Sequence, residues 1–163
     1  MEETANFKLA AQLATVFGVG RSPAAPGTAG SLVALPVAWL LAMWGGRFTL
    51  LLAAILVLAI GSWACEIYVR ATGKEDPSEC VIDEVAGQWI VCAFVPIVAP
   101  FWHSILDYCL AFILFRLFDI LKPWPINWVE RNTPGGLGVM LDDVVAGLMA
   151  CVIIVALAQF GLI

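Results

Sequence analysis

The sequence predicts an all-α integral membrane protein, a polytopic bundle of about five spans with a short interfacial helix at its N-terminus. Of the 163 residues, 62% are apolar (AVILMFWYC) and only 13% are charged. Soluble domains average roughly 45 to 50% apolar residues and about 25% charged residues. One helical crossing of a bilayer takes about 20 residues, so this length allows four or five crossings. We expect residues 1–163 to form a single membrane-embedded domain.

The first half of the chain predicts the interfacial helix and two spans. Residues 7–19 are apolar but too short to cross a bilayer, so we expect them at the membrane interface or against the bundle. Pro23 and Pro26 keep the next segment irregular, which places the first span at about residues 30–45. The uncharged residues 48–64 form the second span.

The second half predicts three more spans. An uncharged run over residues 85–106 predicts a third span that ends near residues 96–100. A fourth, over about residues 104–121, stops at Lys122-Pro123, because proline cannot continue a helix. The fifth begins near residue 139 and runs uncharged from residue 144 to residue 163.

The charges predict an orientation and exclude some functions. With 8 basic and 13 acidic residues, the net charge of −5 offers no basic surplus for nucleic acid. Two glutamates precede the first lysine, unlike the positively charged start of a cleaved signal peptide, so we expect no cleavage. With the N-terminus in the cytoplasm, seven basic residues fall on the cytoplasmic side and only Arg47 falls outside.

This orientation gathers the unusual acidic residues at the cytoplasmic membrane face. They are Asp83, Glu84, Asp119, Asp142 and Asp143. A carboxylate at bilayer depth costs about 2.5 to 3.5 kcal/mol, so it is rarely present without a partner or a task. Hard cations such as Mg²⁺ favour carboxylates, water and phosphate oxygens, which predicts a divalent metal site. The alternative is that these acids only stabilise helix N-termini, by about 0.3 to 1 kcal/mol each.

Two of these acidic pairs lie in segments that resemble each other. DEVAG at residues 83–87 and DDVVAG at residues 142–147 each end in an Ala-Gly that allows another helix or a ligand to approach closely. Counting back from each glycine matches Asp83 with Asp143, whereas aligning the pairs matches Asp83 with Asp142. The sequence leaves both alignments open.

Other residues at this face suit a phosphate group. The glycine- and proline-rich loop over residues 18–31 precedes a helix, and N–H groups at a helix N-terminus bind anions, although the P-loop spacing is missing. The alternative for this loop is an ordinary helix-entry turn. Arg116 and Asp119 share a helix face, which favours an ion pair. In the absence of Cys-x5-Arg and DxDxT motifs, metal-activated water is the chemistry that remains.

Four segments occur in order between residues 18 and 149: GRSPAAPGTAGSL, VIDEVAGQWI, FRLFDILKPWPI and GGLGVMLDDVVAGL. They resemble the bacterial phosphatidylglycerophosphatase A family. The resemblance implies an inner-membrane, Mg²⁺-dependent enzyme that hydrolyses the terminal phosphate monoester of phosphatidylglycerophosphate, giving phosphatidylglycerol. Rival readings are a phosphatase or phosphotransferase acting on another lipid phosphate, a small ion transporter, and a structural partner of a membrane complex.

On this hypothesis, the lipid enters from the inner leaflet and its terminal phosphate meets the metal. The expected metal ligands are Asp83, Glu84, Asp142 and Asp143. Asp119 completes the metal site or orients a basic residue. The expected catalytic residues are the four ligands, Asp119 and Lys122. The expected contacts to the phosphate are Arg21, Thr28, Gly30, Ser31, Arg116 and Lys122.

Overall fold

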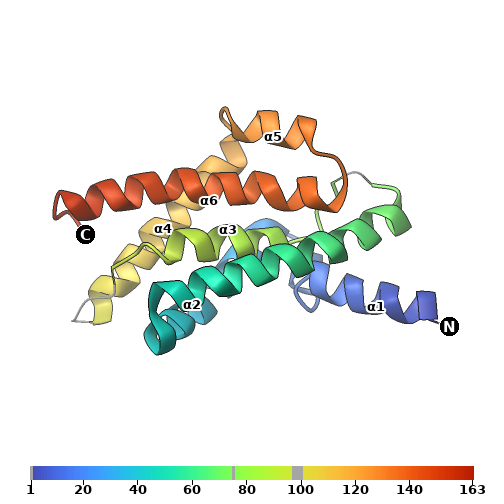
Figure 1. Ribbon diagram of the computed structural model, residues 1–163, viewed down its shortest axis with the longest axis horizontal. Coiled ribbons are helices and arrows are strands. Elements are labelled where there is room, and N and C mark those ends of the chain that lie inside the picture. The colour runs from blue at the N-terminus through green and yellow to red at the C-terminus, as the bar shows by residue number, and fades with distance from the viewer. Residues whose placement is uncertain (1, 75, 97–100) are drawn as a thin grey trace.

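The computed structural model describes residues 2–74, 76–96 and 101–163, and these residues contain helices and no strand. This confirms the all-α prediction (Figure 1). The elements are α1 (Glu2–Ala14), the 3-10 turn η1 (Val19–Arg21), α2 (Pro26–Thr72), α3 (Ile82–Cys92), α4 (Phe101–Leu121), α5 (Ile126–Asn132) and α6 (Gly135–Gln159).

The long helix α2 consists of two arms joined at a sharp kink. Gly46 has φ 69° and ψ −171°, a conformation open to glycine because it has no Cβ. In Figure 1 the chain runs to this kink and returns. Both arms contribute small residues to one buried cluster, among them Ala38 and Ala54. The predicted spans at residues 30–45 and 48–64 are these two arms, and the first arm begins earlier, at Pro26, since proline suits the first helical position.

Helix α3 is the buried centre of the molecule. Ten of its 11 residues are buried, and it packs against α2, α4 and α6. The contact with α6 is made by backbone: a Cβ on Gly147 would lie only 2.6 Å from the carbonyl oxygen of Gly87. The prediction that the two Ala-Gly pairs permit a close helix contact is therefore confirmed.

Within the described residues, two helices, α2 and α6, have the length and apolar composition needed to cross a membrane. The prediction of five spans is therefore not confirmed. The expected third span needs correction, because α3 ends at Cys92 and its 11 residues measure about 16 Å at 1.5 Å per residue, against a hydrocarbon core of about 30 Å. Its expected end falls largely on residues 97–100, outside the described residues. The fourth and fifth predictions correspond to α4 and α6.

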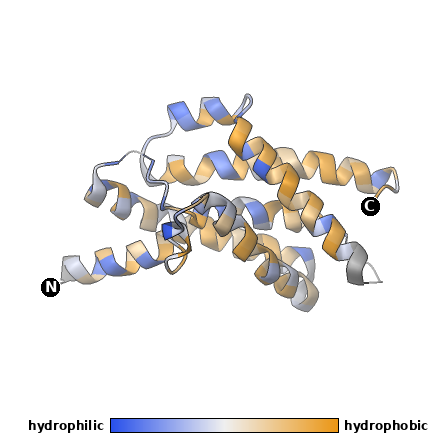
Figure 2. Cartoon of the chain, turned by 180° about the vertical axis from the view of Figure 1, so that it is seen from behind, coloured by the Kyte–Doolittle hydropathy of each residue, from blue (hydrophilic) through white to orange (hydrophobic). Residues whose placement is uncertain are grey.

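The two polar helices lie at the end of the molecule where the charged residues gather. Figure 2 shows hydrophilic residues along α1 and α5, while α4 and the second half of α6 are mostly hydrophobic. The predicted interfacial segment at residues 7–19 is the latter part of α1 and the turn after it. It packs against the end of α2, since the Phe7 ring stacks on Tyr68 with centroids 6.2 Å apart and Ala14 is fully buried.

Candidate functional site

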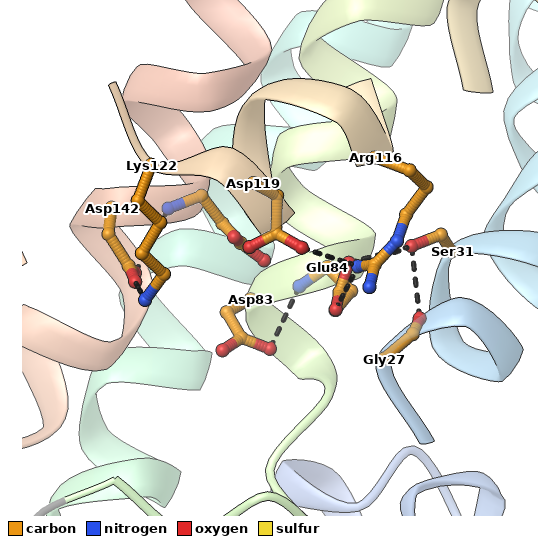
Figure 3. Close-up of polar contacts among 9 residues, drawn as sticks. Gly27, Ser31, Asp83, Glu84, Arg116, Asp119, Lys122 and Asp142 are labelled. Carbon is orange, nitrogen blue, oxygen red and sulfur yellow. Dashed lines mark hydrogen bonds and ion pairs between the residues drawn. The ribbon is translucent and has the colours of Figure 1, made fainter. Parts of the chain in front are cut away.

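Three helices bring one carboxylate each to a common point. Oxygen atoms of Glu84 on α3, Asp119 on α4 and Asp143 on α6 all lie within 4.8 Å of one another. Figure 3 shows Asp119 and Glu84 facing each other across this point. Carboxylate oxygens from several helices are the donors that hard divalent cations take. The donor set therefore fits a magnesium-like ion, and we call these three residues the carboxylate cluster.

Arg116 partly balances the charge of the carboxylate cluster. Its Nη1 pairs with both carboxylate oxygens of Glu84 and lies 2.7 Å from Oδ2 of Asp119. The guanidinium side chain is only 14% exposed, so these contacts are little screened by solvent. The predicted pairing of Arg116 with Asp119 is confirmed. When all three carboxylates are ionised, two negative charges remain, which equals the charge of one divalent cation.

The beginning of α2 holds Glu84 in place. Ser31 donates a hydrogen bond from Oγ to Oε2 of Glu84 at 2.6 Å, so this hydroxyl serves the carboxylate (Figure 3). At Gly27 a Cβ would collide with the same carboxylate, and only glycine leaves the room it needs. The sequence places Gly27 in a candidate phosphate loop but gives no sign that it faces a residue 57 positions away.

A second ionic group lies beside the cluster, around Lys122. Its Nζ lies 2.8 Å from Oδ2 of Asp142 and 2.6 Å from Oε1 of Glu130, and Figure 3 shows the contact with Asp142. Burial alone lowers the pKa of Lys122, but the hydrogen bonds to Asp142 and Glu130 outweigh it and raise the pKa above its ordinary value. The ammonium is therefore charged at neutral pH. Glu130 is a member of this group that the sequence analysis missed.

The backbone of Lys122 is itself unusual. Its φ of 43° lies in the left-handed region, which non-glycine residues seldom adopt. The residue ends α4, where its N–H donates to the carbonyl of Phe118 at 2.8 Å. In this conformation the Lys122 ammonium lies between Asp142 and Glu130.

The two acidic pairs adopt the same local geometry, which settles their equivalence. Oδ1 of Asp83 accepts the backbone N–H of Glu84 at 2.8 Å, and Oδ1 of Asp142 accepts that of Asp143 at 3.0 Å. Asp83 therefore corresponds to Asp142, and the second member of each pair enters the carboxylate cluster. Of the four predicted metal ligands, the structure brings Glu84 and Asp143 together with Asp119, and it places Asp83 and Asp142 outside the cluster.

Three predicted phosphate contacts have other surroundings. Arg21 is exposed at the end of η1. Gly30 lets α2 pack on residue 81, since its Cβ would lie 2.8 Å from Cβ of Val81. Thr28 lies half-buried in the first turn of α2. Among the contacts of the described residues, none joins the side chain of Arg21 or Thr28 to the carboxylate cluster.

Comparison with known proteins gives consistent matches over most of the chain. It is 38% identical to phosphatidylglycerophosphatase A of Escherichia coli over 138 residues, covering 85% of this chain and 77% of that protein. It is 38% identical to the Haemophilus influenzae protein of the same name over 151 residues, covering 92% of this chain and 89% of that protein.

A third relative carries a different name. This is a putative phosphatidylinositol-3-phosphatase of Bacteroides thetaiotaomicron, which is 43% identical over 148 residues and covers 87% of this chain and 89% of that protein. No solved structure matches the chain. The family model described as phosphatidylglycerophosphatase A matches residues 12–158, and the chain therefore belongs to the phosphatidylglycerophosphatase A family.

Proposed function

We propose that this protein is a divalent-metal-dependent phosphatase that hydrolyses the terminal phosphate monoester of phosphatidylglycerophosphate, releasing phosphatidylglycerol and phosphate. The observation that carries the proposal is the convergence of Glu84, Asp119 and Asp143 from three helices within 4.8 Å. Two basic side chains, Arg116 and Lys122, lie alongside, in a chain that belongs to this family.

The carboxylate cluster would hold Mg²⁺. When bound, a divalent cation neutralises phosphate charge and orients or activates a water. Arg116 and Lys122 provide positive charge on two sides of the position where the phosphoryl group would lie, which stabilises the charge of the transition state. N–H groups in the first turn of α2 have no partner within the helix and add donors for phosphate oxygens.

In this proposal, Asp83 and Asp142 do not contact the reacting phosphate themselves. Asp142 holds the ammonium of Lys122, and Asp83 accepts the N–H of Glu84. Asp142 therefore orients a group that would face substrate, and Asp83 caps the first turn of α3 next to Glu84. Such supporting contacts typically contribute about 10- to 100-fold to metal affinity or activity.

We further propose that the chain is a multi-pass protein of the bacterial inner membrane with the site at the cytoplasmic face. The two arms of α2, α4 and α6 would supply the passes, with the short helix α3 buried among them. The seven basic residues on the side of the N-terminus support this orientation. The acyl chains would then remain in the inner leaflet while the headgroup reaches the cluster from the side.

One relative supports a second candidate, phosphatidylinositol 3-phosphate. The Bacteroides thetaiotaomicron protein of that name is 43% identical over 148 residues. A phosphate monoester on a ring alcohol presents the same reacting group to the metal, so the carboxylate cluster alone does not distinguish the two lipids.

The test is phosphate release by purified full-length protein in mixed micelles of each lipid. We expect the larger kcat/KM for phosphatidylglycerophosphate, complete loss with EDTA, and recovery when Mg²⁺ is returned. A larger kcat/KM for phosphatidylinositol 3-phosphate would favour the second candidate. Release that continues in EDTA, without added metal, would overturn the metal assignment.

A further inference from the structure

An apolar groove of about 250 Å³ lies between the first arm of α2 and α4, and we call it the α2–α4 groove. Leu35 and Trp39 line it from α2, and Ile105 and Cys109 line it from α4. The described residues of its lining carry no charge, which suits a hydrocarbon chain and disfavours a charged ligand. Ile105 and Cys109 are exposed, so the groove is open along one side.

The groove continues from the carboxylate cluster along the same helix faces. Leu35 follows Ser31 at i+4 on α2, and Cys109 precedes Arg116 by seven residues on α4, so each pair shares one face of its helix. The two faces meet at the site, where Nη1 of Arg116 lies 3.5 Å from Oγ of Ser31. The same Ser31 hydroxyl donates to Glu84 at 2.6 Å. The groove therefore begins about one helical turn from a ligand of the cluster.

The distances along the helices match the dimensions of the proposed substrate. At 1.5 Å per residue, Leu35 lies about 6 Å beyond Ser31, and Cys109 lies about 10 Å from Arg116. In phosphatidylglycerophosphate, about six bonds join the terminal phosphorus to the anionic phosphodiester and about five more reach an acyl carbonyl, each spanning roughly 1.2 Å when extended. The phosphodiester can therefore stay level with Ser31 and Arg116, outside the apolar lining, while the acyl chain begins at the level of Leu35.

A second apolar groove has a similar size but no such connection. Its volume is about 240 Å³, and α3 lines it with Ile82, Val85 and Trp89. These three positions point about 100° or more away from Glu84 around the axis of α3, because successive residues are 100° apart. Val37 lines this second groove from α2. The second groove is therefore a matched control for the first.

We propose that the α2–α4 groove holds one acyl chain of the substrate phospholipid, and that the headgroup reaches the carboxylate cluster between these two helices. The inference rests on the proposed function and deepens it by naming the side from which the lipid enters. Binding energy from a part of the substrate that does not react can position the reacting group. An acyl chain held in this groove would hold the terminal phosphate at the cluster.

The test fills each groove with a tryptophan. Cys109→Trp fills the α2–α4 groove, and Val37→Trp fills the second groove from an equally exposed class of position. Phosphate release by the purified full-length protein with Mg²⁺ is measured on dioleoyl phosphatidylglycerophosphate in detergent micelles. It is also measured on the deacylated headgroup, glycerophosphoglycerol phosphate, which has the same phosphate monoester and no acyl chain. Activity on the deacylated headgroup shows that a variant is folded.

A reversible chemical block gives the same test without a substitution. Cys109 is exposed, whereas the other four cysteines are buried. A hexyl thiosulfonate therefore attaches an alkyl chain to Cys109 through a mixed disulfide, and a reductant removes it. The labelled wild type is assayed on both substrates before and after reduction.

We expect Cys109→Trp to lose about 10- to 100-fold in kcat/KM on the diacyl lipid, because the phosphate is no longer held in place, and less than about twofold on the deacylated headgroup. Val37→Trp should change by less than about twofold on either substrate, because its groove does not lead to the cluster. The hexyl adduct should behave like Cys109→Trp and recover on reduction.

Three results would overturn the inference. The first is no loss on the diacyl lipid in Cys109→Trp, or an equal loss on both substrates. The second is an equal loss on the diacyl lipid in Val37→Trp. The third is oxidative cross-linking of the wild type into dimers through Cys109 in vesicles, which would place a second copy of the chain at the groove. Absence of phosphate release from both substrates by the wild type would instead contradict the proposed function.

Discussion

Replacing Gly147 by alanine tests whether the contact between α3 and α6 positions the carboxylate cluster. A Cβ there would lie 2.6 Å from the backbone carbonyl of Gly87, about 0.8 Å short of the 3.4 Å at which ordinary contacts begin. Backbone atoms cannot turn aside as a side chain does, so the two helices must separate. Overpacking of this kind typically costs about 1 to 3 kcal/mol.

The separation also reaches the cluster directly. Asp143 lies one helical turn before Gly147, and Glu84 lies about one turn before Gly87. A displacement approaching 1 Å between catalytic groups costs about 100-fold in rate. We therefore expect Gly147→Ala to lower kcat/KM about 100-fold, in addition to its loss of 1 to 3 kcal/mol in stability.

The matched control is Gly61→Ala on α2. A Cβ on Gly61 would meet the terminal methyl of Met140 at 2.6 Å, and this flexible side chain can move away. Both variants are measured in detergent by chemical unfolding and by phosphate release. If Gly147→Ala unfolds and reacts like Gly61→Ala, the close backbone contact does not position the cluster and the reasoning is wrong.

Three further predictions follow from the ionic contacts of the site. Arg116→Met should destabilise the protein in EDTA by about 3 to 5 kcal/mol in chemical unfolding, because it leaves buried carboxylates unpaired. The control Arg70→Met breaks an exposed ion pair and should cost less than about 1 kcal/mol. Similar losses of stability in the two variants would refute the stabilising role of Arg116. Mg²⁺ at 100 times its Kd should stabilise the wild type by about 2.7 kcal/mol but not Asp143→Asn, and equal stabilisation of both would contradict the ligand assignment. Lys122→Met should lower kcat about 100-fold with a smaller change in KM, since its ammonium acts on transition-state charge, and a change in KM alone would argue against that role.

The apolar runs of the sequence predict most of the helices. Lys122-Pro123 marks the end of α4 correctly, and the break between residues 45 and 48 anticipates the kink at Gly46. The end of α3 at Cys92 could not be predicted in the same way, because the uncharged run over residues 85–106 has no proline before Pro96, and a proline excludes the helix only from its own position onward.

The candidate site was predicted in its composition more than in its geometry. The cost of placing a carboxylate at bilayer depth singled out Glu84 and Asp143 as candidate site residues, and the i, i+3 spacing predicted the pairing of Arg116 with Asp119. Adjacent residues point about 100° apart on a helix, so only the crossing of α3, α4 and α6 decides which carboxylate of each pair turns inward. The role of Gly27 depends on a contact between distant segments, which no local pattern encodes.

The most direct test of the central claim, that Glu84, Asp119 and Asp143 hold the catalytic metal, is phosphate release from phosphatidylglycerophosphate by Asp143→Asn. This substitution keeps the size of the side chain and removes one ligand oxygen's charge, and Glu79→Gln serves as the charge-matched control. The account predicts a loss of at least about 100-fold in kcat/KM, more than is usual for residues that only support a ligand, in a protein that remains folded. The account is contradicted if folded Asp143→Asn keeps activity within about threefold of the control, because so small a loss is less than that of a residue that only supports a ligand.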